Sequence, residues 1–318
     1  MMKLPVRLAN IIKEVKFVKK VITKNRLFQK QDLPNYFLLA PFVILFLLFT
    51  VIPICSSVVL SFFDFDMINT PSFAAFNNYR RMFVGDSNFL TVLKNTVILA
   101  VVTGPLGFFL SFILAWFLNE FKPLTRTILS FLFYAPSLVG NAYFIWQVAF
   151  SGDSYGYANS LLLSLGAISE PVKWLKNAAY VMPIVVIVQL WQGMGVSFLA
   201  NISGLQNIND EMYEAGAIDG IRNRWQELWY ITLPSMKSML MFSAVMQIAS
   251  AFSISAIPKV LAGYPSVNNS VDTIVSYLVD VGNVKYELGY ASAISVLLFA
   301  MMFLTRTVVS KLLNKTGK

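Results

Sequence analysis

Long uninterrupted apolar runs are the feature that most constrains the fold of this chain. A transmembrane α-helix needs about 20 predominantly apolar residues, and six segments of that kind are present: 36–60, 95–118, 127–150, 179–199, 236–261 and 290–312. Hydrophobic residues make up 57% of the 318 residues, while only 13% are charged. A soluble domain usually carries about twice that share of charge. The sequence therefore predicts an all-α, polytopic membrane protein with six transmembrane helices.

Prolines interrupt several of the predicted spans. They are Pro41, Pro53, Pro105, Pro136 and Pro183. Proline removes one backbone donor and leaves a carbonyl without its helical partner. Membrane helices tolerate such sites where neighbouring helices or cavity water satisfy the freed group. Local breaks in the spans are therefore expected.

The distribution of charge predicts the orientation of the chain. When both termini, the loop 119–126 and the loop 200–235 are placed on one side, with Lys237 included, that side holds 18 of the 25 lysines and arginines. It holds only 8 of the 16 acidic residues. The positive-inside rule makes this side cytoplasmic, so both termini are predicted inside. Topology thus accounts for the net charge of +9, and no nucleic-acid partner is needed.

Residues 1–35 form a basic segment ahead of the six-span domain, 36–318. Nine lysines and arginines lie within 1–31. Apolar residues recur among them at helical spacing: Leu8, Ile11, Ile12, Val15, Val18 and Ile22. This pattern predicts an amphipathic helix lying on the surface of the membrane lipid.

The composition excludes several kinds of chemistry. The chain has no histidine, which excludes imidazole catalysis and histidine-ligated metal sites. Its single cysteine, Cys55, cannot form a disulfide or a cysteine metal cluster within the chain. No G-x-x-x-x-G-K-[ST] loop is present to hold ATP phosphates. We expect a non-catalytic chain without a metal or cofactor, powered by a gradient or by another subunit.

The polar loop 205–234 has a periodicity of its own. Four apolar residues at helical spacing predict a short amphipathic helix over 208–219: Ile208, Met212, Ala215 and Ile218. Gly220 is suited to end it, and Asn223 followed by Gln226 resembles the capping box of a second helix. That helix would present Trp225, Leu228 and Trp229 on one face. An exposed aromatic face of this kind is typical of a docking surface.

The same loop resembles the EAA signature of binding-protein-dependent ABC importer permeases, E-A-A-x3-G-x9-I-x-L-P. The matching residues are Glu214, Ala215, Gly220, Leu233 and Pro234. Gly216 stands where the signature has its third alanine, and ten residues rather than nine separate Gly220 from Ile231. The resemblance extends through all six spans. "YAPS" in the third and "WQG" in the fourth resemble the carbohydrate-importing, maltose-type branch, which implies the type I ABC importer permease fold.

This resemblance implies a set of partners in a bacterial inner membrane. In this family the loop is a coupling hairpin that docks on a homodimeric ABC ATPase, which binds Mg-ATP. A second permease chain completes the pathway, and an extracytoplasmic solute-binding protein delivers the cargo. Glu214 would pair with a basic residue of the ATPase, and Gly220 would let the two short helices turn. The residues implied at this contact are Glu214, Ala215, Asp219, Gly220, Trp225, Leu233 and Pro234.

Polar residues of three spans are candidates for the translocation path. They are Ser137 and Asn141, then Gln189, Trp191, Gln192 and Gly193, then Gln247 and Ser250. Amides and hydroxyls beside aromatic rings suit sugars, but the same groups also join membrane helices by hydrogen bonds. Spacing alone favours neither reading. The resemblance places five of them where maltose-type permeases contact substrate: Ser137, Gln189, Gln192, Gly193 and Gln247. It implies uptake of an oligosaccharide or related sugar by alternating access.

Alternative functions stay open at this point. An importer of a non-sugar or anionic solute, such as glycerol phosphate or a uronide oligosaccharide, would favour basic residues along the path. None lies well inside a span, which favours a neutral saccharide. A secondary transporter usually needs an intramembrane carboxylate or an unwound ion site, and neither is evident. An intramembrane protease would need a Ser–His dyad or paired aspartates, and the chain has no histidine.

Overall fold

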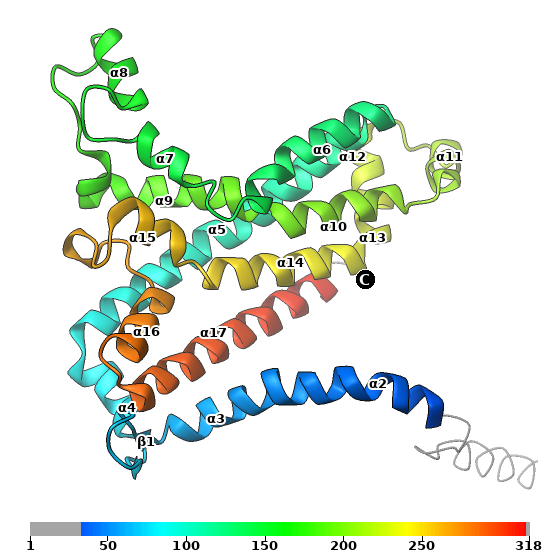
Figure 1. The fold of residues 1–318 in the computed structure, drawn as a ribbon. Helices are drawn as coiled ribbons and strands as arrows, with labels where there is room; N and C mark the ends of the chain where they lie inside the picture. The colour runs from blue at the N-terminus through cyan, green and yellow to red at the C-terminus, as the bar shows by residue number, and fades with distance from the viewer. Residues whose placement is uncertain (1–32, 316–318) are drawn as a thin grey trace, which may run out of the picture. The chain divides into compact units, whose positions relative to one another are not determined.

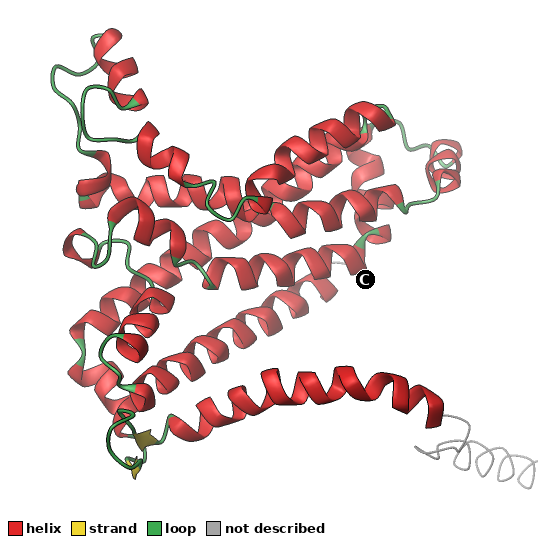
Figure 2. Cartoon of the chain, in the orientation of Figure 1, coloured by secondary structure: helices red, strands yellow, loops and turns green. Residues whose placement is uncertain are grey.

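The computed structural model describes residues 33–315 (Figure 1). The described chain is almost entirely helical, as Figure 2 shows. It contains one small antiparallel pair of strands, β1 (Phe63–Asp64) and β2 (Ser72–Phe73), which sequence patterns did not predict. The chain divides into two units, Met1–Ser56 and Ser57–Lys318. The amphipathic helix predicted within residues 1–31 lies outside the described residues.

The first predicted span is a continuous helical segment over Tyr36–Leu60. It consists of α2 (Leu33–Phe46), the π-helical turn η2 (Leu47–Val51) and α3 (Ile52–Leu60). In η2 the Ile52 N–H bonds to the carbonyl of Leu47, five residues back. The wide turn immediately precedes Pro53, which has no N–H to donate. This proline therefore coincides with a local change of helix type rather than with a break.

The second unit is built around α5 (Ser87–Asn119), a helix of 33 residues that Pro105 does not interrupt. α10 (Gly195–Gln206) and α14 (Lys237–Phe252) pack along α5, and α17 (Leu288–Lys315) packs on α14. The other elements are α4 (Asn77–Arg80), η3 (Arg81–Gly85), α6 (Pro123–Leu138), α7 (Phe144–Ala149), α8 (Tyr157–Ser164), η4 (Trp174–Lys176), α9 (Ala178–Gly193), α11 (Asp210–Ile218), α12 (Arg224–Glu227), η5 (Leu228–Thr232), α13 (Leu233–Ser235), α15 (Ala256–Ala262), η6 (Val267–Asn269) and α16 (Ile274–Asn283).

Within residues 33–315, four helical segments are long and apolar enough to cross a membrane, and the bent pair α9–α10 gives up to five. The third predicted span, 127–150, is not one continuous helix. α6 ends at Leu138, Val139 is extended with φ −89° and ψ 101°, and α7 begins only at Phe144. Pro136 and Gly140 lie on either side of this end. Both residue types weaken a helix, one by losing a donor and the other by its backbone freedom.

The fourth predicted span is longer than expected and bent. α9 and α10 meet at Met194 with an angle of 44° between them. Together they extend from Ala178 to Gln206, seven residues beyond the predicted end at 199. Gly193 and Gly195 flank the junction. The bend therefore falls between two glycines, whose backbone freedom disfavours a straight helix.

Asp86 ties three helices together at the end of the second unit that lies away from α11 (Figure 1). Its carboxylate caps α5 by accepting from the Phe89 N–H at 3.0 Å. It also accepts from the Tyr277 hydroxyl at 2.5 Å and the Tyr290 hydroxyl at 2.8 Å. Burial raises the pKa of Asp86, but the hydrogen bonds from Tyr277, Phe89 and Tyr290 outweigh it and hold the pKa below its ordinary value.

Candidate functional site

α11 and α12 form the predicted helix–turn–helix hairpin at one end of the second unit (Figure 1). Asn209 caps α11 by accepting from the Glu211 N–H at 3.2 Å. Asn223 caps α12 as predicted, accepting from the Gln226 N–H at 2.9 Å. Gly220 turns the chain between them with φ at +94°, a region that side-chain-bearing residues rarely adopt. The local sequence thus determines the turn through two caps and one glycine.

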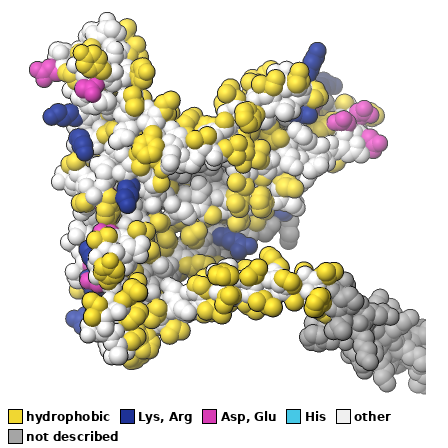
Figure 3. Space-filling view, in the orientation of Figure 1, with side chains coloured by type: hydrophobic (Ala, Val, Ile, Leu, Met, Phe, Trp, Pro, Cys, Tyr) yellow, Lys and Arg dark blue, Asp and Glu magenta, His cyan; other side chains and the backbone are white. Residues whose placement is uncertain are grey.

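The predicted docking residues lie on the accessible surface of this hairpin. Glu214, Ala215, Asp219 and Gly220 are exposed, and Trp225 is 65% exposed. Leu233 is half-buried and Pro234 is exposed where the hairpin meets α14. Figure 3 shows acidic side chains gathered over α11, which carries Asp210, Glu211 and Glu214 and is followed by Asp219. The hairpin therefore offers an acidic, partly aromatic surface to a partner.

Gly216 is the buried residue of α11, and it packs against Ile231. A Cβ atom at Gly216 would lie 2.6 Å from Ile231 Cδ1, so a larger residue would force the isoleucine to move. Ile231 belongs to η5, a π-helical turn in which the Leu233 N–H bonds to the Leu228 carbonyl. A π turn holds one residue more than an α turn. Both departures from the EAA signature, Gly216 and the extra residue before Ile231, therefore lie close to the contact between Gly216 and Ile231.

Arg224 joins the hairpin to the end of α5. Its guanidinium bonds to Glu227 within α12 at 2.7 Å and to Glu120, next to α5, at 2.8 Å. The rings of Trp225 and Trp116, a residue of α5, lie 5.5 Å apart. Sequence reasoning missed Glu120 and Trp116 because each lies about a hundred positions from its partner, and no spacing rule reaches that far. One ion pair and one ring contact therefore join the hairpin to the end of α5.

A cavity of about 380 Å³, which we name the serine pocket, lies between the end of α6, the α9–α10 junction and α14. Its lining residues are Ser137, Gln192, Gly193, Gly195, Val196, Ser197, Met246, Ala249, Ser250 and Ser253. Four predicted path residues thus meet: Ser137, Gln192, Gly193 and Ser250. Among the residues that the structure describes, none that lines the pocket is charged. The Gln192 side chain lines the pocket, and its Oε1 atom is buried without a hydrogen-bond partner among the described residues.

Two glycines allow the walls of the serine pocket to approach one another. A Cβ atom at Gly195 would lie 2.5 Å from the Ser137 Oγ atom and 2.6 Å from its Cβ atom. A Cβ atom at Gly193 would lie 3.4 Å from the Ser250 Oγ atom. Small residues at such crossings let membrane helices pack closely. The bend at Met194 therefore brings α6 and α14 to the same short stretch of chain.

The other four predicted path residues lie outside the lining of the serine pocket. Gln247 is 3% exposed and joins three helices, since its Oε1 accepts from the Ser197 hydroxyl at 3.1 Å and its Nε2 donates to the Thr103 carbonyl at 3.3 Å. Gln189 is buried in α9. The Trp191 ring packs edge-to-face on Trp146 at 5.6 Å. Asn141 is exposed and accepts from the Tyr143 hydroxyl at 3.0 Å.

Comparison with known proteins agrees with this architecture. Residues 107–316 match the family described as binding-protein-dependent transport system inner membrane component. The chain is 31% identical over 294 residues to the probable ABC transporter permease protein YesP of Bacillus subtilis, covering 91% of this chain and 93% of YesP. It is also 31% identical to the arabinooligosaccharides transport system permease protein AraP of the same organism, covering 90% of each chain.

Solved structures share the fold. One is a bacterial ABC transporter involved in the import of the acidic polysaccharide alginate, with a TM-score of 0.75 at 22% identity, covering 91% of this chain and 98% of the matched chain. Another is the alginate transporter in complex with its alginate pentasaccharide-bound periplasmic protein, with a TM-score of 0.75 at 21% identity. At such identities the likeness concerns the fold alone. The family match covers well over half of the sequence, and the chain therefore belongs to the inner membrane components of binding-protein-dependent ABC transport systems.

Proposed function

We propose that this chain is the permease subunit through which an ABC importer takes up a neutral oligosaccharide or related sugar. The serine pocket is the observation that carries the proposal. Its lining, among the described residues, combines serine hydroxyls, the amide side chain of Gln192 and two glycines, and includes no charged residue. Such groups donate to and accept from sugar hydroxyls, and the relative AraP is named for arabinooligosaccharides. The uncharged lining favours a neutral sugar over an acidic one.

The serine pocket would supply half of the path, and a second permease chain would supply the other half. An extracytoplasmic binding protein would deliver the sugar, and two copies of an ATPase that binds Mg-ATP would power the cycle. The acidic surface of α11 would sit in a groove with basic residues on the ATPase, with Glu214 forming one ion pair. Through Arg224 and Trp225, closure of the ATPase would move α5 and switch the path from one side to the other.

The orientation belongs to the same proposal. The hairpin and both termini would lie in the cytoplasm, as the positive-inside rule predicts. Labelling of single cysteines with a membrane-impermeant maleimide tests this in a Cys55→Ser background. A cysteine replacing Asp219 should react only in inside-out vesicles, whereas one replacing Tyr155 should react in intact cells. The reverse pattern would contradict the orientation.

Transport measurements on Gln192 variants test the sugar pathway. In proteoliposomes holding the whole transporter and its binding protein, Gln192→Ala should lower sugar transport roughly two- to tenfold, the worth of one hydrogen bond. Gln192→Asn should recover part of that loss. Gln147→Ala is the matched control, because Gln147 is an exposed residue of α7 that does not line the pocket. Equal transport by Gln192→Ala and wild type would remove Gln192 from the path.

Binding of the ATPase is measured separately, by co-purification from detergent. Glu214→Lys should lose the ATPase, while Gln192→Ala should retain it. If the wild-type chain retains the ATPase but the reconstituted transporter moves no sugar, the docking proposal stands and the proposed substrate class is refuted.

A further inference from the structure

We propose that an apolar groove beside the hairpin binds an acyl chain of an anionic phospholipid, and that Lys237 meets its headgroup phosphate. This site differs from the serine pocket and takes a lipid rather than the transported solute. The inference uses the orientation proposed above, with the hairpin end of the molecule in the cytoplasm.

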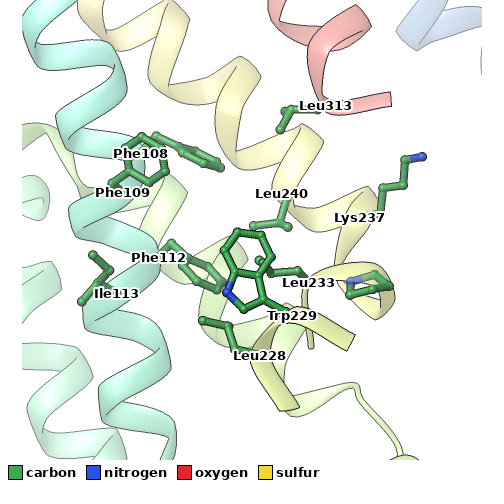
Figure 4. A pocket seen from close by; sticks show the side chains of 11 residues that line it. Phe108, Phe109, Phe112, Ile113, Leu228, Trp229, Leu233, Lys237, Leu240 and Leu313 are labelled. Atoms are coloured by element: carbon green, nitrogen blue, oxygen red, sulfur yellow. The ribbon is translucent and has the colours of Figure 1, made fainter. Parts of the chain in front are cut away.

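The groove has a volume of about 410 Å³ and lies where the hairpin joins α14 (Figure 4). Its lining residues are Phe108, Phe109, Phe112, Ile113, Leu228, Trp229, Leu233, Pro234, Lys237, Leu240 and Leu313. They come from α5, η5, α13, α14 and the end of α17. Lys237 is the charged residue among them. An almost wholly apolar hollow with one cation therefore opens beside the docking hairpin.

A second hollow of about 410 Å³ continues the groove along α5. It shares Phe108, Phe109 and Leu313 with the first and reaches Ala100. From Ala100 to Ile113, α5 rises by about 20 Å at 1.5 Å per residue. One leaflet contributes about 15 Å of hydrocarbon. The two hollows together are thus long enough to hold an acyl chain across its own leaflet.

The large side chains around the groove are exposed rather than packed into the core. Phe109 is 57%, Ile113 53% and Trp229 62% exposed. Phe109 and Ile113 lie within the apolar span Ser87–Asn119, and Trp229 lies eight residues before the span Lys237–Ala262. Exposed apolar surface of this extent marks a contact site, and in a membrane the surrounding medium supplies acyl chains. The apolar walls therefore suit the hydrocarbon part of a lipid.

Lys237 determines which lipid headgroup the groove favours. It is the first residue of the span Lys237–Ala262, at the end next to the hairpin. Figure 4 shows its side chain pointing outward from the groove rather than into it, while the Trp229 ring lies within the lining. Lysine stems lie along apolar surface while the ammonium reaches the interface. The cytoplasmic leaflet carries anionic lipid, so charge complementarity favours an anionic headgroup over a zwitterionic one.

The position of the groove gives the lipid a consequence for transport. Leu228, Trp229, Leu233 and Pro234 form part of the wall, and these residues connect the hairpin to α14. An acyl chain in the groove would support this junction from the lipid side. The bound lipid would therefore stiffen the element that carries movement from the ATPase into the membrane.

Quenching of Trp229 fluorescence by brominated lipids tests the site directly. The whole transporter is placed in nanodiscs containing either brominated phosphatidylglycerol or brominated phosphatidylcholine. The chain has six tryptophans, so the difference between wild type and Trp229→Phe isolates the Trp229 signal. Phosphatidylglycerol should occupy the groove with an apparent affinity about fivefold above that of phosphatidylcholine.

Two variants distinguish recognition of the headgroup by Lys237 from a general effect of positive charge. Lys237→Gln should abolish the preference for phosphatidylglycerol. Lys311→Gln should preserve it, because Lys311 is an exposed residue of α17 outside the lining. Equal quenching by both lipids in wild type would overturn the anionic headgroup. Absence of quenching by either lipid would mean that protein covers the groove, which overturns the site. Neither readout depends on sugar transport, so this inference and the proposed substrate class fail separately.

Discussion

The α11–α12 hairpin and the serine pocket both depend on glycine, for opposite reasons. In the hairpin, Gly220 supplies a backbone conformation, and no atom of the described residues lies within 4 Å of where its Cβ atom would be. At the pocket, Gly195 supplies space, because the Ser137 side chain occupies the volume of its missing Cβ atom. The first surface presents carboxylates and rings to water, whereas the second encloses uncharged polar groups.

This contrast separates two kinds of binding within one chain. A surface with several exposed carboxylates and an aromatic ring suits a protein partner that has basic groups and a pocket for the ring. A pocket of neutral hydroxyls and an amide contributes about 1 kcal/mol per hydrogen bond, so a solute can enter it and leave. Substitutions at the hairpin should therefore damage association and coupling, while those at the pocket should damage passage.

Replacing Gly220 should have the largest effect. Proline fixes φ near −65°, whereas Gly220 adopts +94°, so Gly220→Pro should disrupt the turn. Because a misplaced proline costs about 3 kcal/mol or more, ATP-driven transport should fall by more than tenfold. Gly166→Pro is the matched control, because Gly166 also has positive φ, at +68°, and lies in the loop after α8. Retained ATPase association and transport in Gly220→Pro would contradict a role for this turn in docking.

Filling the space at Gly195 should have the next largest effect. Gly195→Ala forces Ser137 and α6 away from α10, which should cost about 1–3 kcal/mol by overpacking. The measurement is thermal unfolding in detergent, together with sugar transport. Adding Ser137→Gly should restore much of the loss. Gly104→Ala serves as a control, since its Cβ atom would make an ordinary contact at 3.8 Å from Ala251. Similar losses in both alanine variants would show that the close approach at Gly195 is not special.

The link from the hairpin to α5 should contribute less. The side chains of Arg224 and Glu120 are 63% and 45% exposed, and such ion pairs are worth about 0.2–1 kcal/mol. Arg224→Gln and Glu120→Gln should each reduce the sugar moved per ATP by up to about fivefold. The double variant should be no worse than the more impaired single variant. Fully additive losses would show that the two residues act independently.

The pH dependence of stability should show the smallest effect. Hydrogen bonds hold the folded pKa of Asp86 below its ordinary value of 3.8. The carboxylate therefore stabilises the folded state above that value, and this contribution is lost as pH falls through the lowered folded pKa. Denaturation midpoints measured from neutral pH down to about pH 3 should fall less steeply in Asp86→Asn than in wild type. Parallel curves would remove Asp86 as a source of acid sensitivity.

Elements set by neighbours in the chain were predictable from the sequence. The cap at Asn223 and the turn at Gly220 were predicted correctly, because a cap and a turn depend on residues only a few positions apart in the sequence. The placement of the first, second, fifth and sixth spans also agrees with the structure, since hydropathy depends on composition alone. The break after Leu138 agrees with the local breaks expected at the prolines, but its position was not predicted, because proline and glycine are tolerated in many membrane helices.

Contacts between distant helices were only partly predictable. Ser137, Gln192, Gly193 and Ser250 meet in one pocket because a bend and two glycines bring their helices together. Gln247 has the same residue type and a similar spacing, yet it bonds to Ser197 and Thr103 outside the pocket lining. Which face of α14 meets the pocket depends on packing around α5. That packing is not encoded in the spacing of polar residues along a single span.

The π-helical turn η5 bears on how relatives of this chain should be aligned. The π turn directly precedes Leu233 and Pro234, and its wider bond from the Leu233 N–H to the Leu228 carbonyl offers room for one extra residue before the fifth span. An insertion of one residue should therefore be assigned to 228–232 rather than to the turn at Gly220. An alignment built in this way keeps Glu214, Leu233 and Pro234 all in register with the EAA signature.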